Sequence, residues 1–179
     1  MKEIILVRHA SSEKAAEGKD MLRKLLPKGW EEARNVAFLL SKAQKRIDLI
    51  ITSNAVRAVE TGDAFQSAAY KNTTRIVEKT LFSGGKQEYL AVIKALEDTN
   101  NTVLLIAHNP VLEEVVAYFC GCSISKVDFP KASVYAFKFD CDHWKDVGSE
   151  HSILTLFIKR SHIQKLVEKP DNQVNKHNN

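Results

Sequence analysis

Three short runs of apolar residues, each followed at once by polar residues, limit how this chain can fold. A run of this length that ends at a polar cluster is typical of a strand buried on both faces of a sheet. The runs are Glu3–Val7, Ile47–Ile51 and Thr102–Ala107. Segments with apolar residues at helical spacing follow or separate these runs. The helical segments are residues 28–45, 55–69, 86–98 and 111–119.

The alternation of strands and helices predicts an α/β protein. We expect a three-layer α/β/α sandwich with a largely parallel central sheet, because parallel strands need helical crossovers that cover both faces. Arg75–Thr80 is a weaker strand candidate, with polar residues mixed in. Ala132–Phe139 and Ile153–Ile158 are also strand-like. This last pair predicts a hairpin or two neighbouring strands at one side of the sheet.

The length of 179 residues suits one domain with a sizeable core. We expect this domain over residues 1–166. Residues 167–179 are polar, with one proline and several asparagines, and this composition predicts a disordered tail.

Composition and charge argue against several classes of protein. The 26 basic and 22 acidic residues give a net charge of +4, and the basic residues are spread along the chain instead of clustering with aromatics. We therefore expect no nucleic acid as partner. The apolar start is interrupted by Arg8, well short of the about 7–15 apolar residues of a secretory signal. With three cysteines, an odd number that suits reduced thiols, the sequence predicts a cytoplasmic protein without a membrane segment.

A polar cluster follows each of the three apolar runs. The clusters are Arg8-His9-Ala10, Ser53 to Arg57, and His108-Asn109-Pro110. The carboxyl ends of parallel strands meet at one edge of a sheet, so these clusters can converge on one crevice. Arginine matches phosphate oxygens with its planar fork, and histidine can attack phosphorus or donate a hydrogen bond. The convergence therefore predicts an anion site.

The three clusters resemble the motifs of the histidine phosphatase superfamily. Leu6-Val7-Arg8-His9-Ala10 is similar to its signature, with alanine where many members have glycine. Ser53-x-x-x-Arg57-Ala58-x-x-Thr61 is similar to the second block, and Ile106-Ala107-His108-Asn109-Pro110 to the third. Leu26-Pro27-x-Gly29 also fits, although many members have threonine in place of Pro27. Order and spacing agree over residues 4–120, and the start of the chain looks most like the SixA-type phosphohistidine phosphatases.

The resemblance implies a phosphoglycerate mutase-like fold and a role for each motif residue. His9 would attack phosphorus and become phosphohistidine. Arg8, Arg57 and His108 would hold the phosphate oxygens and stabilise their charge in the transition state. We expect no metal and no cofactor, because fixed donors can supply both positioning and charge stabilisation. The substrate would be a phosphohistidine in a protein partner, or a small phosphorylated molecule.

A general acid for the leaving group is not identified by any motif. The family often has an acidic residue where this chain has Thr80-Leu81-Phe82, and Glu13 and Glu88 are candidates that no motif supports. An alkoxide leaves badly without a proton, whereas a protonated imidazole leaves well. This favours a phosphorus–nitrogen bond in the substrate.

Other polar residues have simpler interpretations. Ser53 is expected to cap the helix that follows it. Asp140-Cys141-Asp142-His143 has the residue types of a metal site, but His151 is the nearby candidate for a further ligand, and we expect no metal there. Cys120 and Cys122 are expected to be small packing residues.

Two alternative functions remain open at this point. A small-molecule phosphomonoesterase or mutase would need an identifiable acid and a deeper cap. A module that binds phosphorylated ligands without turnover would not need the nucleophile, yet Arg8, His9, Arg57 and His108 are all present.

Overall fold

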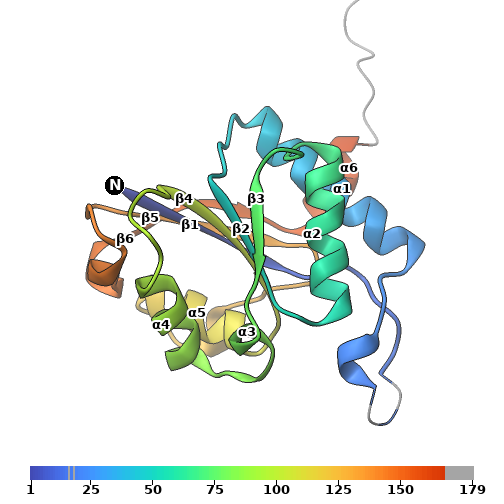
Figure 1. Cartoon of the computed structure of the whole chain (residues 1–179), viewed down its shortest axis with the longest axis horizontal. Helices are drawn as coiled ribbons and strands as arrows, with labels where there is room; N and C mark the ends of the chain where they lie inside the picture. Colours follow the sequence, from blue (N-terminus) through green and yellow to red (C-terminus); the bar gives the residue numbers. More distant parts are fainter. Residues whose placement is uncertain (16, 18, 168–179) are drawn as a thin grey trace, which may run out of the picture.

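The computed structural model describes residues 1–15, 17 and 19–167 of the chain (Figure 1). Its sheet has six strands in the order β3-β2-β4-β1-β5-β6. The strands β1, β2, β3 and β4 pair in parallel, whereas β5 pairs antiparallel with both β1 and β6. The bounds are β1 Lys2–Arg8, β2 Leu49–Thr52, β3 Thr74–Val77, β4 Thr102–Ala107, β5 Val134–Phe139 and β6 Ser152–Ile158.

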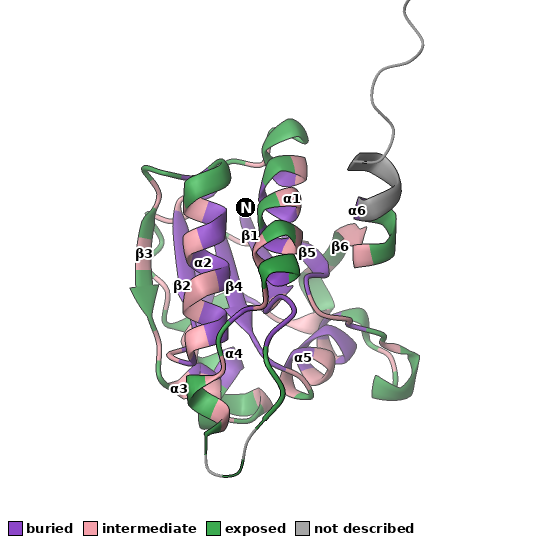
Figure 2. Ribbon diagram, turned by 90° about the vertical axis from the view of Figure 1, so that its right-hand side faces the viewer, coloured by how far each residue is buried: buried purple, intermediate pink, exposed green. Residues whose placement is uncertain are grey.

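Helices cover both faces of this sheet (Figures 1 and 2). One face carries α1, α2 and α6, and the other carries α3, α4 and α5. Their bounds are α1 Pro27–Lys42, α2 Val56–Ala68, α3 Thr80–Ser83, α4 Lys86–Lys94, α5 Val111–Cys120 and α6 Arg160–Val167. The predicted α/β/α sandwich is confirmed, with a sheet that is parallel over four strands and antiparallel at one side.

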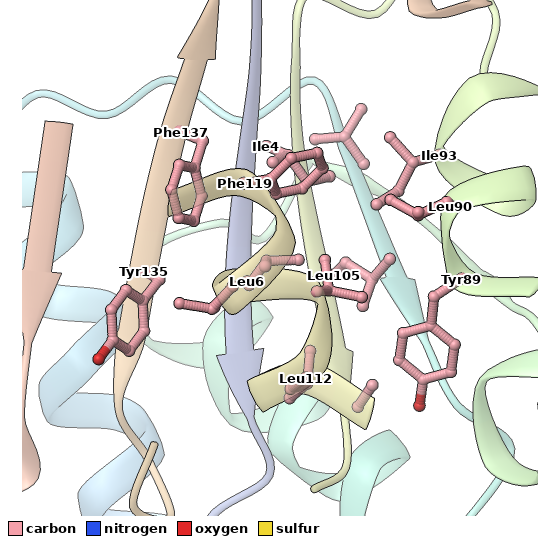
Figure 3. Packing of buried hydrophobic residues seen from close by; sticks show 14 of the residues in the cluster. Ile4, Leu6, Tyr89, Leu90, Ile93, Leu105, Leu112, Phe119, Tyr135 and Phe137 are labelled. Carbon is pink, nitrogen blue, oxygen red and sulfur yellow. The ribbon is translucent and has the colours of Figure 1, made fainter. Parts of the chain in front are cut away.

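Successive side chains of the central strands point to opposite faces, which explains the continuous apolar runs. Ile4 and Leu6 of β1 belong to the core beneath α4 and α5, whereas Ile5 and Val7 belong to the core beneath α1 and α2. Figure 3 shows Leu6 and neighbouring side chains of the first core packed between the sheet and the helices. All four of these β1 residues are fully buried.

Several predicted boundaries were wrong for local reasons. The third parallel strand ends at Val77 because the carboxylate of Glu78 accepts the backbone N–H of Thr80, and Thr80 starts α3 instead of ending the strand. The helix predicted over residues 86–98 ends at Lys94. The carboxylate of Asp98, beyond that helix, accepts the backbone N–H of Trp144.

The C-terminal part of the chain is described as far as Val167, the last residue of α6. The predicted disordered tail therefore lies, from residue 168 on, outside the described residues. No helix in the described part of the chain is long and apolar enough to cross a membrane.

Candidate active site

The three polar clusters converge because their strands are neighbours in the sheet. Strand β4 lies between β1 and β2, and Arg8 is paired in register with Ala107. Beyond the strand ends, the backbone N–H of His9 donates to Ala107, and that of Ser53 donates to Ile106. The structure therefore brings together the four residues that the sequence suggested, Arg8, His9, Arg57 and His108.

The imidazole of His9 is held by a hydrogen bond at each nitrogen. Its Nδ1 lies 2.8 Å from the carbonyl oxygen of Ala10, and its Nε2 accepts a hydrogen bond from Nε of Arg57 at 3.2 Å. A carbonyl can only accept and an arginine can only donate, so the proton is on Nδ1 and the lone pair is on Nε2. His9 is only 4% exposed. Nε2 thus carries the lone pair of the ring, and it faces the guanidinium.

Burial keeps this imidazole neutral. The pKa of His9 is lowered to about 2, mainly because the charged form would lose its water. The hydrogen bond to Ala10 opposes the shift, while the neighbouring His108, Arg57 and Arg8 add to it. A neutral ring is the form that can attack phosphorus.

Arg57 is the second residue of α2, whose first residue is Val56. Besides its bond to His9, its Nη1 donates to the carbonyl oxygen of Asp20 at 2.6 Å and its Nη2 to the carboxylate of Asp20 at 2.9 Å. Its guanidinium lies 5.9 Å from the ring centre of Phe82. The side chain is therefore fixed along its whole length, and two of its donors are occupied by oxygens.

Ser53 does not cap α2, so the expected helix cap was wrong. Ala55 is the N-cap residue, and no side chain caps this helix. The hydroxyl of Ser53 accepts the N–H of Ala55 at 3.2 Å and lies 2.8 Å from Nε2 of His108. Because the chain makes a turn between β2 and α2, the hydroxyl is directed at the third cluster and orients its histidine.

His108 is buried beside His9, with 5.1 Å between the two ring centres. Its Nδ1 is buried and has no hydrogen-bond partner among the described residues. Burial, with Arg57 as the next cause, lowers the pKa of His108 to about 3, although Asp20 opposes the shift. An unpaired buried polar atom is costly, so Nδ1 is a position where a ligand atom would be stabilising.

Arg8 reaches the site from the end of β1. Its Nη1 donates to the carbonyl oxygen of Phe129 at 2.8 Å, and this carbonyl also accepts from the side chain of Asn109 at 3.0 Å. Its Nε is buried without a partner among the described residues. Burial lowers the pKa of Arg8, but an arginine stays charged in proteins. The site therefore contains two guanidinium groups and two neutral imidazoles.

Asp20 and Arg23 are components of the site that no sequence motif indicated. Asp20 begins a short 3-10 helix, Asp20–Leu22, and its carboxylate bridges Arg57 and Arg23 at 2.9 and 2.8 Å. Burial opposes the shift, but Arg57 and Arg23 lower the pKa of Asp20 overall. In the sequence this segment looks like a polar loop, so only the folded chain places it over the site. Phe82 was also missed, because the predicted strand Arg75–Thr80 took in only the first residue of its helix α3. Its ring meets that of His108 edge-on at 5.8 Å.

The two glutamates considered as general acids do not contact this site. Glu13 accepts the backbone N–H of Lys24 at 3.0 Å, and Glu88 accepts that of Gly85 at the start of α4 at 2.9 Å. Both carboxylates are exposed. Asp20 is thus the carboxylate that the described residues bring to the arginines.

The residues of the other candidate clusters lie elsewhere. His143 pairs with Asp98 at 2.8 Å. The described residues contain no group of three or more histidine, cysteine or acidic side chains that could hold a metal ion. Cys120 is exposed and Cys122 half-buried, so the expected packing role is wrong for Cys120.

The loop that follows His9 contacts the helices α1 and α2. The hydroxyl of Thr61 accepts the N–H of Ala10 at 3.2 Å and donates to the carbonyl oxygen of Arg57 at 2.6 Å. Helix α1 approaches so closely that a Cβ on Gly29 would lie 2.0 Å from the carbonyl oxygen of Ser11. Only glycine fits at this contact. The two motif residues Thr61 and Gly29 therefore position the loop that carries His9.

Comparisons with known proteins agree with this geometry. The sequence profile of the histidine phosphatase superfamily (branch 1) matches residues 4–81, which include the first two polar clusters. No curated protein is a significant sequence match to the chain.

Similar solved structures cover most of the chain. A candidate phosphohistidine phosphatase SixA from Agrobacterium tumefaciens is 25% identical, with a TM-score of 0.75 over 88% of this chain and 97% of that one. The protein histidine phosphatase SixA complexed with tungstate is 20% identical, with a TM-score of 0.77 over 90% and 99%. A phosphoserine phosphatase from Entamoeba histolytica is 17% identical, with a TM-score of 0.64 over 91% and 100%. The profile match over residues 4–81, the converging motifs and these structural likenesses all point to similarity with the histidine phosphatase superfamily.

Proposed function

We propose that this protein is a metal-independent phosphatase. Its His9 accepts the phosphoryl group, and water then hydrolyses the phosphohistidine. The observation that carries the proposal is the state of the His9 ring. Its lone pair is on Nε2, its proton is fixed on Nδ1, and its neutral form is favoured by burial. A nucleophile that is unprotonated and already oriented needs no base to activate it.

In the first step the hydrogen bond from Nε of Arg57 to Nε2 is given up. Nε2 then forms a bond to phosphorus while the bond to the leaving group breaks. The leaving group takes the bonding electron pair, and Nδ1 keeps its proton. Arg8, Arg57 and Nδ1 of His108 hold the phosphate oxygens, because Arg57 contacts Nε2 and the other two have unpaired buried atoms. Water then attacks the phosphoryl group on His9, which releases phosphate and restores the imidazole.

Asp20 accepts hydrogen bonds from Arg57 with two of its oxygens. One is its carbonyl oxygen and the other belongs to its carboxylate. A phosphate can offer the same kind of acceptor to the same fork. We infer that the substrate phosphate competes with Asp20 for these donors.

The charges around Asp20 favour a phosphorus–nitrogen substrate. Arg57 and Arg23 lower the pKa of its carboxyl, so the group is ionised at neutral pH and is a poor proton donor. When phosphohistidine is the substrate, the leaving group is its imidazole. Water can protonate this imidazole beforehand, so no acidic side chain of the enzyme is needed. We therefore propose phosphohistidine in a protein as the substrate. We also propose a cytoplasmic location, which the three free thiols support.

Trapping the phosphorylated protein tests the mechanism. Brief incubation with an aryl phosphate, whose leaving group needs no acid, should yield an acid-labile and base-stable phosphoprotein. The label should be absent in His9→Ala. It should be present in His151→Ala, because His151 is exposed in the 3-10 helix Ser149–His151. Label that survives in His9→Ala would refute the assignment of the nucleophile.

A comparison of substrates tests the leaving group. Release of phosphate from a phosphohistidine peptide should exceed that from the matched phosphoserine peptide and from sugar phosphates. A preference for sugar phosphates would favour the alternative of a small-molecule phosphatase. Addition of a chelator should leave the rate unchanged, and a loss that magnesium or zinc restores would contradict the metal-independent mechanism.

A further inference from the structure

The peptide group that joins Ala10 to Ser11 is hydrogen-bonded on both of its sides. Its carbonyl oxygen accepts the proton on Nδ1 of His9 at 2.8 Å. Its N–H, which belongs to Ser11, donates to Oε2 of Glu32 at 3.0 Å. A peptide is a planar conjugated unit, so both bonds act on the same electrons. The nucleophile and the carboxylate are therefore connected through one peptide.

The carboxylate of Glu32 is held in place by both of its oxygens. Oε1 accepts the hydroxyl of Ser11 at 3.0 Å and Nη1 of Arg160 at 3.1 Å. Glu32 lies on α1, its side chain is only 10% exposed, and Arg160 comes from α6 on the same face of the sheet. A carboxylate that is fixed and mostly shielded from water acts more strongly on its neighbours than a solvated one.

We propose that Glu32 is a positioning residue for His9, acting through the Ala10–Ser11 peptide. Its charge draws the Ser11 proton and shifts electron density toward the Ala10 carbonyl, which becomes a stronger acceptor for Nδ1–H. In many hydrolases a carboxylate bonds the catalytic imidazole directly. In this chain one peptide is inserted between the two groups.

This inference rests on the proposed function, because it describes how the same nucleophile is supported. When Nε2 forms its bond to phosphorus, positive charge develops on the imidazole ring. The bond from Nδ1–H to Ala10 then strengthens, so the charge of Glu32 stabilises the transition state more than the ground state. No proton moves along the peptide: Nδ1 and the Ser11 nitrogen each keep their own.

A merely structural role for Glu32 would be a tether between α1 and α6. Such a tether would affect the stability of the fold without altering the Nδ1–H bond of His9. The proton on Nδ1 is therefore the most direct probe, since its NMR shift moves upfield when its hydrogen bond weakens.

The experiment records the imidazole and amide protons of the free protein by NMR. The Nδ1–H signal of His9 is identified by its absence in His9→Ala. In Glu32→Gln, which keeps the shape and removes the charge, the Ser11 amide and the His9 Nδ1–H signals should both move upfield. Both should move further in Glu32→Ala. The matched control is Glu31→Gln, because Glu31 is the preceding residue of α1 and is exposed. In this variant the Ser11 amide and His9 Nδ1–H signals should stay at the wild-type positions.

Arg160→Gln separates the tether from the charge effect. This variant removes the other partner of Glu32 and leaves the bond from Ser11 intact. The Nδ1–H signal should stay in place or move slightly downfield, because the carboxylate is less neutralised. An upfield movement equal to that of Glu32→Gln would overturn the proposal. So would an unchanged Nδ1–H signal in Glu32→Ala while the Ser11 amide moves.

Turnover provides the second readout. With an aryl phosphate, Glu32→Gln should lower kcat about tenfold, the scale on which removal of an outer carboxylate partner affects a functional histidine, and leave KM nearly unchanged. A rise in KM at constant kcat would contradict the proposal. The NMR measurement needs no substrate, so it decides the role of Glu32 even if the wild-type protein hydrolyses no phosphate, an outcome that would refute only the proposed function.

Discussion

The floor and the rim of the candidate site differ in burial, charge and attachment. We define the floor as Arg8, His9, Ser53 and His108, and the rim as Asp20 and Arg23. Ser53 and His9 are 0% and 4% exposed, whereas the side chain of Asp20 is 48% exposed. The floor follows directly from three adjacent strands of the sheet. The rim consists of the first residue of a short 3-10 helix, Asp20, and the residue that follows the helix, Arg23, and ion pairs join it to the site.

This difference suggests a division of roles. Buried residues at strand ends keep one geometry, so they can hold a nucleophile in line with phosphorus. Exposed ion pairs contribute little to stability and exchange partners readily. Arg57 contacts both regions, through His9 on the floor and Asp20 on the rim. We therefore expect chemistry to depend on the floor and substrate binding to be tuned by the rim.

The largest effect is expected from Arg57, where floor and rim meet. Loss of a donor that strengthens in the transition state costs on the order of 2.7–4 kcal/mol. Arg57→Ala should therefore lower kcat for an aryl phosphate by roughly a hundredfold or more. Arg57→Lys should recover only part of this, since lysine keeps the charge and loses the fork.

Arg34→Ala and Arg46→Ala are the controls for Arg57. Arg34 lies on α1 beside Trp30, and Arg46 is almost fully exposed beside Asp48. Both variants should retain the wild-type rate. If Arg57→Ala behaved as they do, the convergence of the three clusters would have no catalytic meaning.

A medium effect is expected on the stability of the fold in acid, and it should arise from the two histidines of the floor. The pKa values of His9 and His108 are lowered to about 2 and about 3 in the folded chain, from 6.5. Between those values the unfolded chain binds more protons than the folded one, so stability rises with pH and is lost as pH falls below about 6.5. Each histidine adds a slope of up to about 1.4 kcal/mol per pH unit to the free energy of unfolding.

Urea unfolding at several pH values between 6.5 and 5 measures this slope. The slope should be shallower in His9→Gln, because one of the two buried imidazoles is gone. His151→Gln, at an exposed position, is the control. A slope that is the same in His9→Gln and the wild type would mean that the floor is open to water.

The smallest effect is expected from the rim. Asp20→Asn removes the negative charge that competes with phosphate for Arg57. The side chain of Asp20 is 48% exposed while that of Arg57 is 5% exposed, so water screens this pair from one side. On the scale of a surface ion pair, about 0.2–1 kcal/mol, KM and the inhibition constant of inorganic phosphate should fall by at most about fivefold. We expect kcat to stay nearly constant.

Glu17→Gln is the matched control for Asp20, since it removes an exposed carboxylate from the same part of the chain. It should leave KM unchanged. A large loss of kcat in Asp20→Asn would instead place Asp20 in the chemistry and remove the distinction between floor and rim.

The sequence by itself predicted the central strands and the floor residues Arg8, His9 and His108, together with Arg57. The apolar runs predicted β1, β2 and β4 because strands buried on both faces must be apolar throughout. The polar residues after those strands predicted Arg8, His9, Arg57 and His108, because parallel strands place their carboxyl ends at one edge. A hairpin or two neighbouring strands at one side of the sheet were also predicted, and β5 and β6 form an antiparallel pair there.

Only the tertiary structure decided which further side chains meet those residues. Asp20 and Glu32 belong to segments whose sequences show an ordinary polar loop and an amphipathic helix, and Phe82 lies just beyond the weak strand candidate Arg75–Thr80. Their contacts depend on how closely α1 approaches Ser11 and on where the chain turns after Glu78. Periodicity reports which face of an element is buried, but a hydrogen bond across the sheet depends on distances between elements far apart in the sequence. For that reason the proposed nucleophile His9 could be predicted from its motif, whereas Glu32, the carboxylate connected to it through one peptide, could not.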